Sequence, residues 1–216
     1  MPTLLESPPT PLSLADVASI SRQLADDISH LLLRTEGFSV EDYLSLDGPY
    51  LVEYLQGSLQ ILPMPTAPHQ AIAFVLANLL VAWSKPDTLA RTKLAPFRVR
   101  LSDKLYREPD VCFMRGVNAH RRNNRFWIGA DLVVEIISET NRAHDMQTKL
   151  AEYAAAGIPE YWIIHPEEKT ISVFMLAEGA YVLHGNFNAG QVATSVLLSG
   201  FAVGVSDLFA AAEAQA

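Results

Sequence analysis

The sequence lacks the features that mark several protein classes. Its 216 residues contain one cysteine, Cys112, which leaves no partner for a disulfide within the chain. Cys112 lies in a strand-like run, which is typical of a small core residue rather than a nucleophile. The longest apolar stretch, from Ala71 to Trp83, is shorter than the ~18 residues of a membrane span. The proline-rich start shows no secretory pattern, so we expect a cytoplasmic protein without a membrane segment.

Common ligand-binding motifs are also missing. The six histidines show no zinc-like spacing, and they are His30, His69, His120, His144, His165 and His184. There is no glycine-rich phosphate loop, no dinucleotide fingerprint and no nucleophile elbow. These absences argue against a structural zinc domain, a nucleotide-binding enzyme of a common type and a serine hydrolase.

Charge is distributed unevenly along the chain. The formal net charge of -8 argues against nonspecific binding to nucleic acid, because attraction to phosphates is mainly electrostatic. Residues 91–125 nevertheless hold ten of the sixteen lysines and arginines and only three acids. This segment could form a basic face on an acidic protein, or its arginines could simply alternate outward into solvent. Both interpretations remain open.

The order of expected elements indicates one α/β domain. We expect a disordered segment at 1–12, an amphipathic helix at 13–36, the domain itself at 38–209 and a frayed C-terminus at 210–216. Helices are expected from residue 39, at 69–83 and at 141–156, and strands at 50–54, 58–62, 97–101, 110–114, 132–137, 161–164 and 171–176, with one or two more between 181 and 205. This order predicts a mixed central sheet flanked by helices.

One carboxylate stands inside an apolar strand. Residues 131–138 read Asp-Leu-Val-Val-Glu-Ile-Ile-Ser, with Glu135 in the middle of a run that predicts burial on both faces. An unpaired ionised side chain there would cost several kcal/mol or more. A protein cation, a bound metal ion or a proton must therefore compensate Glu135.

The neighbouring segments favour a metal ion with a nearby lysine. Asp110 follows Pro109 and opens a strand that could lie beside the strand of Glu135. Paired carboxylates suit Mg²⁺ or Mn²⁺, which prefer hard oxygen ligands. Lys149 follows fourteen residues after Glu135, on a helix expected to pack next to that strand. Its ammonium could orient a metal-bound water and neutralise charge that develops on a phosphate.

These residues resemble the Uma-two type of putative restriction endonuclease, a branch of the PD-(D/E)XK nuclease superfamily. The resemblance covers roughly residues 38–209, and it rests on Glu53 with Gly57, Met64-Pro65, His69, Pro109-Asp110, Glu135, Asp145, Lys149, Tyr153, Gly157 and Tyr161-Trp162. It implies a restriction-endonuclease-like core with the N-terminal helix as an addition. In the superfamily the lysine usually lies two residues after the glutamate, where this chain has Ile137. The resemblance implies that Lys149 takes that role.

The resemblance also implies an activity and a division of roles. A metal-dependent endonuclease acting on DNA would hold Mg²⁺ or Mn²⁺ through Asp110, Glu135 and the carbonyl of Ile136. Lys149 would orient the attacking water, and Glu53 would hold a second metal or position the water.

Further residues would support these groups. His69 could polarise a phosphate or water, although a capping or core role fits it equally well. Asp145 or Tyr153 would hold Lys149 in place. The loop from Met114 to Phe126 would contact the phosphate backbone through Arg115, Arg121, Arg122 and Arg125, or it could be a solvated loop.

Other interpretations remain. The missing lysine at position 137 and the acidic net charge are also typical of an inactive nuclease fold that binds DNA or a partner protein. Asp145 and Lys149 could be an ordinary helix pair, Asp110 a solvated strand start and Glu53 an exposed hairpin residue. A glycosidase using Asp110 and Glu135 would leave Lys149 without a role. The N-terminal helix could form a homodimer interface or cover the domain's own core.

Overall fold

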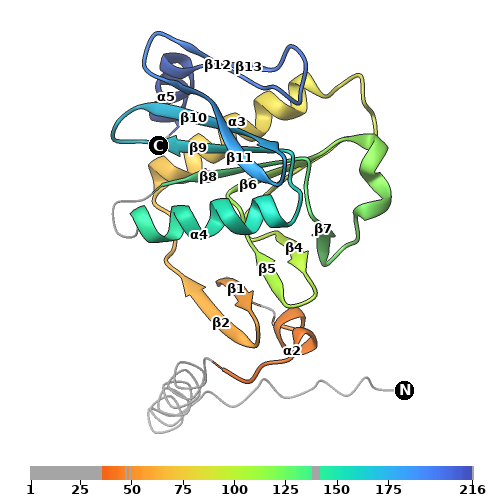
Figure 1. Cartoon of the computed structure of the whole chain (residues 1–216). Coiled ribbons are helices and arrows are strands. Elements are labelled where there is room, and N and C mark those ends of the chain that lie inside the picture. The colour runs from red at the N-terminus through yellow and green to blue at the C-terminus, as the bar shows by residue number, and fades with distance from the viewer. Residues whose placement is uncertain (1–35, 47, 49, 138–141, 216) are drawn as a thin grey trace, which may run out of the picture.

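The computed structural model describes residues 36–46, 48, 50–137 and 142–215. The segment 1–12 and nearly all of the expected helix 13–36 lie outside the described residues. Two large β-sheets and the helices packed on them make up the described structure (Figure 1). Within these ranges every helix is too short or too polar to cross a lipid bilayer.

The larger sheet has six strands in the order β11-β10-β9-β8-β6-β3. Their bounds are β3 (Arg91–Leu94), β6 (Val111–Met114), β8 (Leu132–Ile136), β9 (Glu160–His165), β10 (Thr170–Ala177) and β11 (Ala180–Phe187). Strands β8 and β9 are parallel, and the other neighbours are antiparallel. The predicted mixed central sheet is therefore confirmed.

Helices cover both faces of this sheet (Figure 1). Helices α3 (Ala67–Trp83) and α5 (Val205–Glu213) pack together on one face, and α4 (Arg142–Ala155) lies on the other. Along β8, Leu132, Val134 and Ile136 join the hydrophobic cluster that contains α3, whereas Val133 joins the cluster that contains Tyr153 of α4. Because side chains alternate along a strand, Glu135 shares the α4 face with Val133.

The smaller sheet has five strands in the order β2-β1-β5-β4-β7. Their bounds are β1 (Leu51–Leu55), β2 (Ser58–Leu62), β4 (Arg98–Ser102), β5 (Leu105–Arg107) and β7 (Phe126–Ile128). The predicted hairpin of β1 and β2 is confirmed, and both turn residues, Gln56 and Gly57, have positive φ angles of 51° and 100°. The short helix α2 (Val40–Leu44) begins with a capping box between Ser39 and Asp42.

Three further elements complete the described chain. A 3-10 helix η1 (Gly116–Arg121) precedes β7, and β12 (Val192–Thr194) pairs with β13 (Ala202–Gly204). The prediction of a frayed end at 210–216 is wrong up to Glu213, where helix α5 ends. Phe209 and Ala212 are buried in the core cluster, so packing against α3 stabilises this segment.

A buried carboxylate in β9 provides a test of the fold. Glu160 accepts hydrogen bonds from Trp162 Nε1 and Ser195 Oγ on one oxygen, and from the backbone N–H of Val196 and Leu197 on the other, all at 2.7 Å. In Glu160→Gln, the side-chain NH₂ group would replace one accepting oxygen and would face N–H groups that can only donate to it. We expect this variant to lose about 2–4 kcal/mol of unfolding free energy in urea titrations. The exposed control Glu178→Gln should change stability little, and equal stability of the two variants would contradict this role.

Candidate active site

The sheet brings Asp110 and Glu135 together. Strands β6 and β8 are antiparallel neighbours with Val111 opposite Val134, which places the residue before β6 next to the end of β8. Asp110 Oδ2 accepts a hydrogen bond of 2.7 Å from the backbone N–H of Ile136. The side chain of Asp110 is 16% exposed, so its carboxylate remains accessible. Asp110 and Glu135 therefore lie near one another, where β6 begins and β8 ends.

Helix α4 supplies the cation that meets Glu135. Lys149 Nζ lies 3.0 Å from Glu135 Oε2, and Tyr153 OH donates a 2.6 Å hydrogen bond to Glu135 Oε1. Lys149 and Tyr153 are four residues apart, so they share one face of the helix. Burial, together with the charges of Asp110 and Glu53, raises the pKa of Glu135 to about 7, although Lys149 opposes the shift. A proton, the ammonium of Lys149 and a bound metal ion could each therefore compensate the charge of Glu135.

His69 faces the same carboxylate from helix α3. The helix begins after Thr66, and it places His69 Nε2 3.2 Å from Asp110 Oδ2 and 3.1 Å from the carbonyl oxygen of Ile136. Burial lowers the pKa of His69, but the hydrogen bond and charge of Asp110 outweigh it, so that the net shift is upward. His69 thus contacts two of the three predicted metal ligands.

The oxygen atoms at this edge suit a hard divalent cation. Among the described residues, no three side chains of His, Cys, Asp or Glu converge into a metal cluster. Glu135 instead turns toward Lys149 and Tyr153. A metal here would rest on Asp110, Glu135, the Ile136 carbonyl and water, which matches the habit of Mg²⁺ to use one or two carboxylates and keep several waters. The donor set therefore fits Mg²⁺ or Mn²⁺.

Glu53 is buried and fully engaged rather than exposed in the hairpin. Arg107 Nη1 contacts Glu53 Oε2, and the backbone N–H of Glu108 donates a 3.2 Å hydrogen bond to Glu53 Oε1. Lys149 Nζ lies 3.8 Å from the same Oε1. Because both oxygens already have partners, the geometry favours a role in positioning Lys149 over a role as ligand of a second metal.

Arg107 ties this network to helix α4. Its Nε and Nη2 donate hydrogen bonds of 2.8 and 2.9 Å to the carboxylate of Glu152, while its Nη1 contacts Glu53. Sequence reasoning missed both Arg107 and Glu152. One signal was available, since Lys149, Glu152 and Tyr153 fall at helical spacing on a single face of α4.

The predicted phosphate-contacting arginines lie at the other end of β8. Asp131, directly before β8, accepts a hydrogen bond of 2.7 Å from the backbone N–H of Arg115, and it lies 3.8 Å from Arg121 Nη1. Asp131 and Glu135 are four positions apart on the extended chain, roughly 13 Å along the sheet. Arg125 pairs with Glu41 at 3.1 Å, and Arg122 Nε donates to the carbonyl of Ala119 at 3.5 Å.

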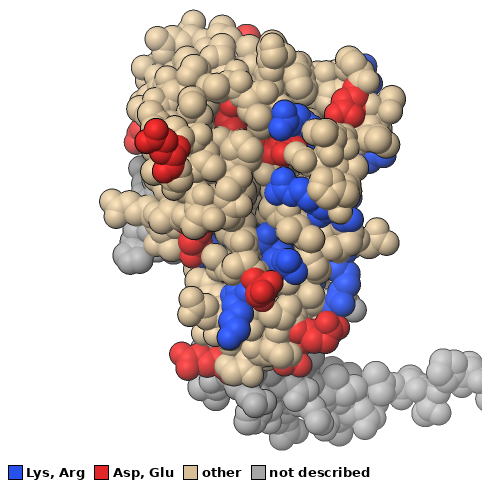
Figure 2. Space-filling view, turned by 45° about the vertical axis from the view of Figure 1, so that its right-hand side comes forward, with Lys and Arg blue, Asp and Glu red and all other residues tan. Residues whose placement is uncertain are grey.

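Basic side chains do gather on that side of the molecule. Figure 2 shows lysines and arginines in a band down one face, with acidic side chains between them. Several of these arginines pair with acidic side chains of the protein itself, so part of their positive charge is already compensated. Asp145 belongs to residues 142–146, whose side chains lie outside the described part of the structure.

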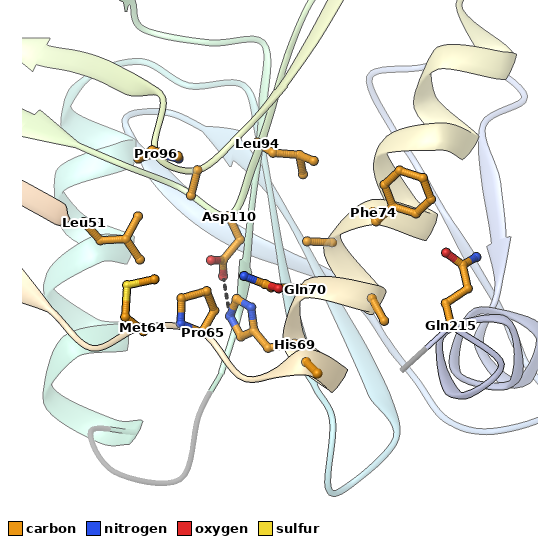
Figure 3. Close-up of a pocket in the computed structure, with 14 residues that line it drawn as sticks. Leu51, Met64, Pro65, His69, Gln70, Phe74, Leu94, Pro96, Asp110 and Gln215 are labelled. Atoms are coloured by element: carbon orange, nitrogen blue, oxygen red, sulfur yellow. Dashed lines mark ion pairs between the residues drawn. The ribbon is translucent and has the colours of Figure 1, made fainter. Parts of the chain in front are cut away.

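A cavity of about 480 Å³ opens next to the carboxylate edge (Figure 3). Asp110 and His69 contribute to its lining, and Phe74 of α3 and Met64 of the proline-rich segment lie around them. Asp110 therefore borders a space large enough for a small ligand.

Comparisons with known proteins bear on the family and the fold of the chain. A family model described as Uma2, putative restriction endonuclease, matches residues 40–206. Among solved structures, the chain is similar to a putative nuclease belonging to DUF820 from Anabaena variabilis, with a TM-score of 0.67 and 22% sequence identity. The similarity covers 81% of this chain and 99% of that one, and it shows a shared fold. The search among curated proteins finds no match.

Proposed function

Because the chain belongs to the Uma2 family of putative restriction endonucleases, we propose that it is a metal-dependent endonuclease that hydrolyses phosphodiester bonds in DNA. One observation carries this proposal. Lys149 lies 3.0 Å from Glu135, and Glu135 lies near the end of a strand paired with the strand that follows Asp110. A lysine beside two carboxylates at one sheet edge can serve hydrolysis of a phosphate ester.

The residues divide the work of binding a metal and orienting water. Asp110, Glu135 and the carbonyl of Ile136 would hold Mg²⁺ or Mn²⁺, which supplies Lewis-acid polarisation of the phosphate when bound. With that ion bound, Lys149 would orient the attacking water through its ammonium and neutralise charge on the phosphate. His69, held at Asp110, can donate a hydrogen bond to a phosphate oxygen.

Positioning residues keep Lys149 in reach. Glu53 lies 3.8 Å from Lys149 Nζ, and Arg107 fixes Glu53 in turn. Tyr153 holds the carboxylate of Glu135, and Asp145 keeps its proposed supporting role. The arginines of the loop before β7 remain proposed contacts for the phosphate backbone away from the cleaved bond.

An inactive nuclease fold that binds DNA or a partner protein is the second candidate. It is favoured by the close pairing of Lys149 with both Glu135 and Glu53, which accounts for a buried lysine without any chemistry. Titration calorimetry with Mn²⁺ separates the two, because an inert module should release no heat that depends on Glu135.

Cleavage of supercoiled plasmid tests the activity. With Mg²⁺ or Mn²⁺ the protein should nick or linearise the plasmid, and Asp110→Asn should lose at least a hundredfold in rate because one of two carboxylate ligands is removed. Asp103→Asn is a matched control, since Asp103 is 94% exposed and remote from the carboxylate pair. Equal activity of the wild type and Asp110→Asn would point to a contaminant or to a different site.

Binding of Mn²⁺ should depend on pH. A metal must displace the proton of Glu135, whose pKa burial raises to about 7. Affinity should therefore rise roughly tenfold between pH 6 and pH 8 and then level off, and the raised pKa of His69 acts in the same direction. Calorimetry at both pH values measures this. Glu135→Gln should remove the larger part of the pH dependence and leave the part due to His69, whereas the exposed control Glu168→Gln should keep all of it. An Mn²⁺ affinity of the wild type that does not change with pH would contradict the prediction.

A further inference from the structure

The cavity beside Asp110 has no role in the chemistry proposed above. Asp110 and His69 form only one part of its lining, and the rest is mostly apolar (Figure 3). The apolar side chains come from separate segments of the chain and include Met64, Pro65, Phe74, Leu94 and Pro96. Phe74 is 49% exposed and Met64 is 65% exposed, so apolar surface remains open toward a ligand.

The lining chemistry indicates what could enter. No lysine or arginine lines the cavity, and its one basic side chain, His69, lies 3.2 Å from Asp110. Its polar lining residues are His69, Gln70, Asp110 and Gln215, and the first three lie at the carboxylate end. No hydrogen bond joins the side-chain amide of Gln70 to another described residue. A flat, uncharged ligand with a polar edge matches a space with apolar walls and an amide at one end.

We propose that this cavity receives one unstacked nucleobase of the substrate strand, next to the phosphate that lies at Asp110. The proposal rests on the proposed function, because a phosphodiester held at Asp110 brings the adjoining nucleotide to the cavity mouth. The base would stack on Phe74, and the amide of Gln70 would contact its polar edge, as glutamine does with adenine.

The pairing state of the substrate determines how easily a base can enter the cavity. A base within a duplex cannot enter a cavity unless it leaves the stack and its pairing partner, which costs a few kcal/mol. A base in a single strand, a flap or a mismatch avoids most of that cost. The protein should therefore prefer nucleic acid with unpaired nucleotides over a fully paired duplex.

Binding measurements with matched variants test this preference. Fluorescence anisotropy would follow a labelled 12-nucleotide single strand and the corresponding duplex, with Ca²⁺ present so that binding occurs with little cleavage. The wild type should bind the single strand at least tenfold more tightly than the duplex. Phe74→Ala should weaken single-strand binding roughly tenfold, because one stacking surface is lost, and leave duplex binding unchanged. Gln70→Ala should weaken it by a smaller factor.

The control lies on the same helix. Leu79 is also apolar and 38% exposed but does not line the cavity, so Leu79→Ala should bind both substrates as the wild type does. Equal single-strand affinities of Phe74→Ala and Leu79→Ala would overturn the nucleobase proposal. The same result is expected if the cavity binds an apolar peptide side chain instead of a base. That result would leave plasmid cleavage by the wild-type protein unaffected. The nucleobase proposal can therefore be wrong while the proposed endonuclease activity is correct.

Discussion

Replacing Lys149 with methionine should lower the rate of plasmid cleavage by a factor of roughly 10²–10³ while leaving the fold intact. The reason is that Lys149 is the described cation closest to Glu135, at 3.0 Å, and no other residue replaces its ammonium at the water position. The loss should fall on the cleavage rate rather than on DNA affinity, because Lys149 is buried and contributes little to the outer surface. Single-turnover cleavage at saturating protein measures this directly.

The matched control for Lys149 is Lys169→Met. Lys169 pairs with Glu213 at 2.8 Å on the surface, where both side chains are exposed, so its loss should leave cleavage unchanged. Thermal melting must accompany both variants, because Lys149→Met removes a partner from two buried carboxylates. Glu135 can take up a proton instead, since its pKa is already about 7. Full activity of a folded Lys149→Met would contradict the assignment of Lys149.

Replacing Arg107 with methionine should destabilise the protein by about 3–5 kcal/mol, because it leaves the buried carboxylate of Glu53 without its partner. Arg107 is itself buried, and it contacts Glu53 and both oxygens of Glu152. Unfolding in urea, followed by circular dichroism, gives the change in free energy. The slope of the transition should stay similar, because the surface exposed on unfolding hardly changes.

Two variants make the Arg107 prediction specific. Arg125→Met removes a surface pair with Glu41 and should cost less than about 1 kcal/mol. In the double variant Arg107→Met with Glu53→Gln the uncompensated charge is gone, so part of the lost stability should return. A loss in Arg107→Met no larger than in Arg125→Met would show that the buried network does not hold the two sheets and α4 together.

The strongest sequence signals concerned single residues in regular elements. The apolar run around Glu135 predicted a buried strand, and the strand that follows Asp110 is its antiparallel neighbour. The helix carrying Lys149 ends at Ala155, next to its expected end at residue 156, and Gly157 just beyond it adopts a φ of 72° that other residues rarely accept. These features depend on local periodicity and on backbone preference, both of which can be read from a short window.

Other features depended on contacts between distant segments. Strands β3 and β7 are short and partly exposed, and β7 pairs in parallel with β4 across 28 residues. Nothing in a charged run such as residues 104–108 indicates that Arg107 faces inward, since its partners Glu53 and Glu152 lie far away in the sequence. For the same reason Glu53 could be predicted as a candidate but not as a buried one.

The separation of the arginine loop from the carboxylates also needed the structure. Asp131 and Glu135 are four residues apart in the sequence, yet an extended strand places them at opposite ends of β8. Two of the loop arginines, Arg115 and Arg121, therefore lie at Asp131 rather than at Glu135. Any phosphate that they contact would belong to a part of the substrate distant from the cleaved bond.

Anomalous scattering from a crystal soaked in Mn²⁺ tests the central claim most directly, because it locates the metal and its ligands together. We expect one strong peak bounded by the carboxylates of Asp110 and Glu135 and the carbonyl oxygen of Ile136. Lys149 should then have left Glu135 and point toward a metal-bound water. A peak elsewhere, or a Glu135 still paired with Lys149 at saturating Mn²⁺, would contradict the account.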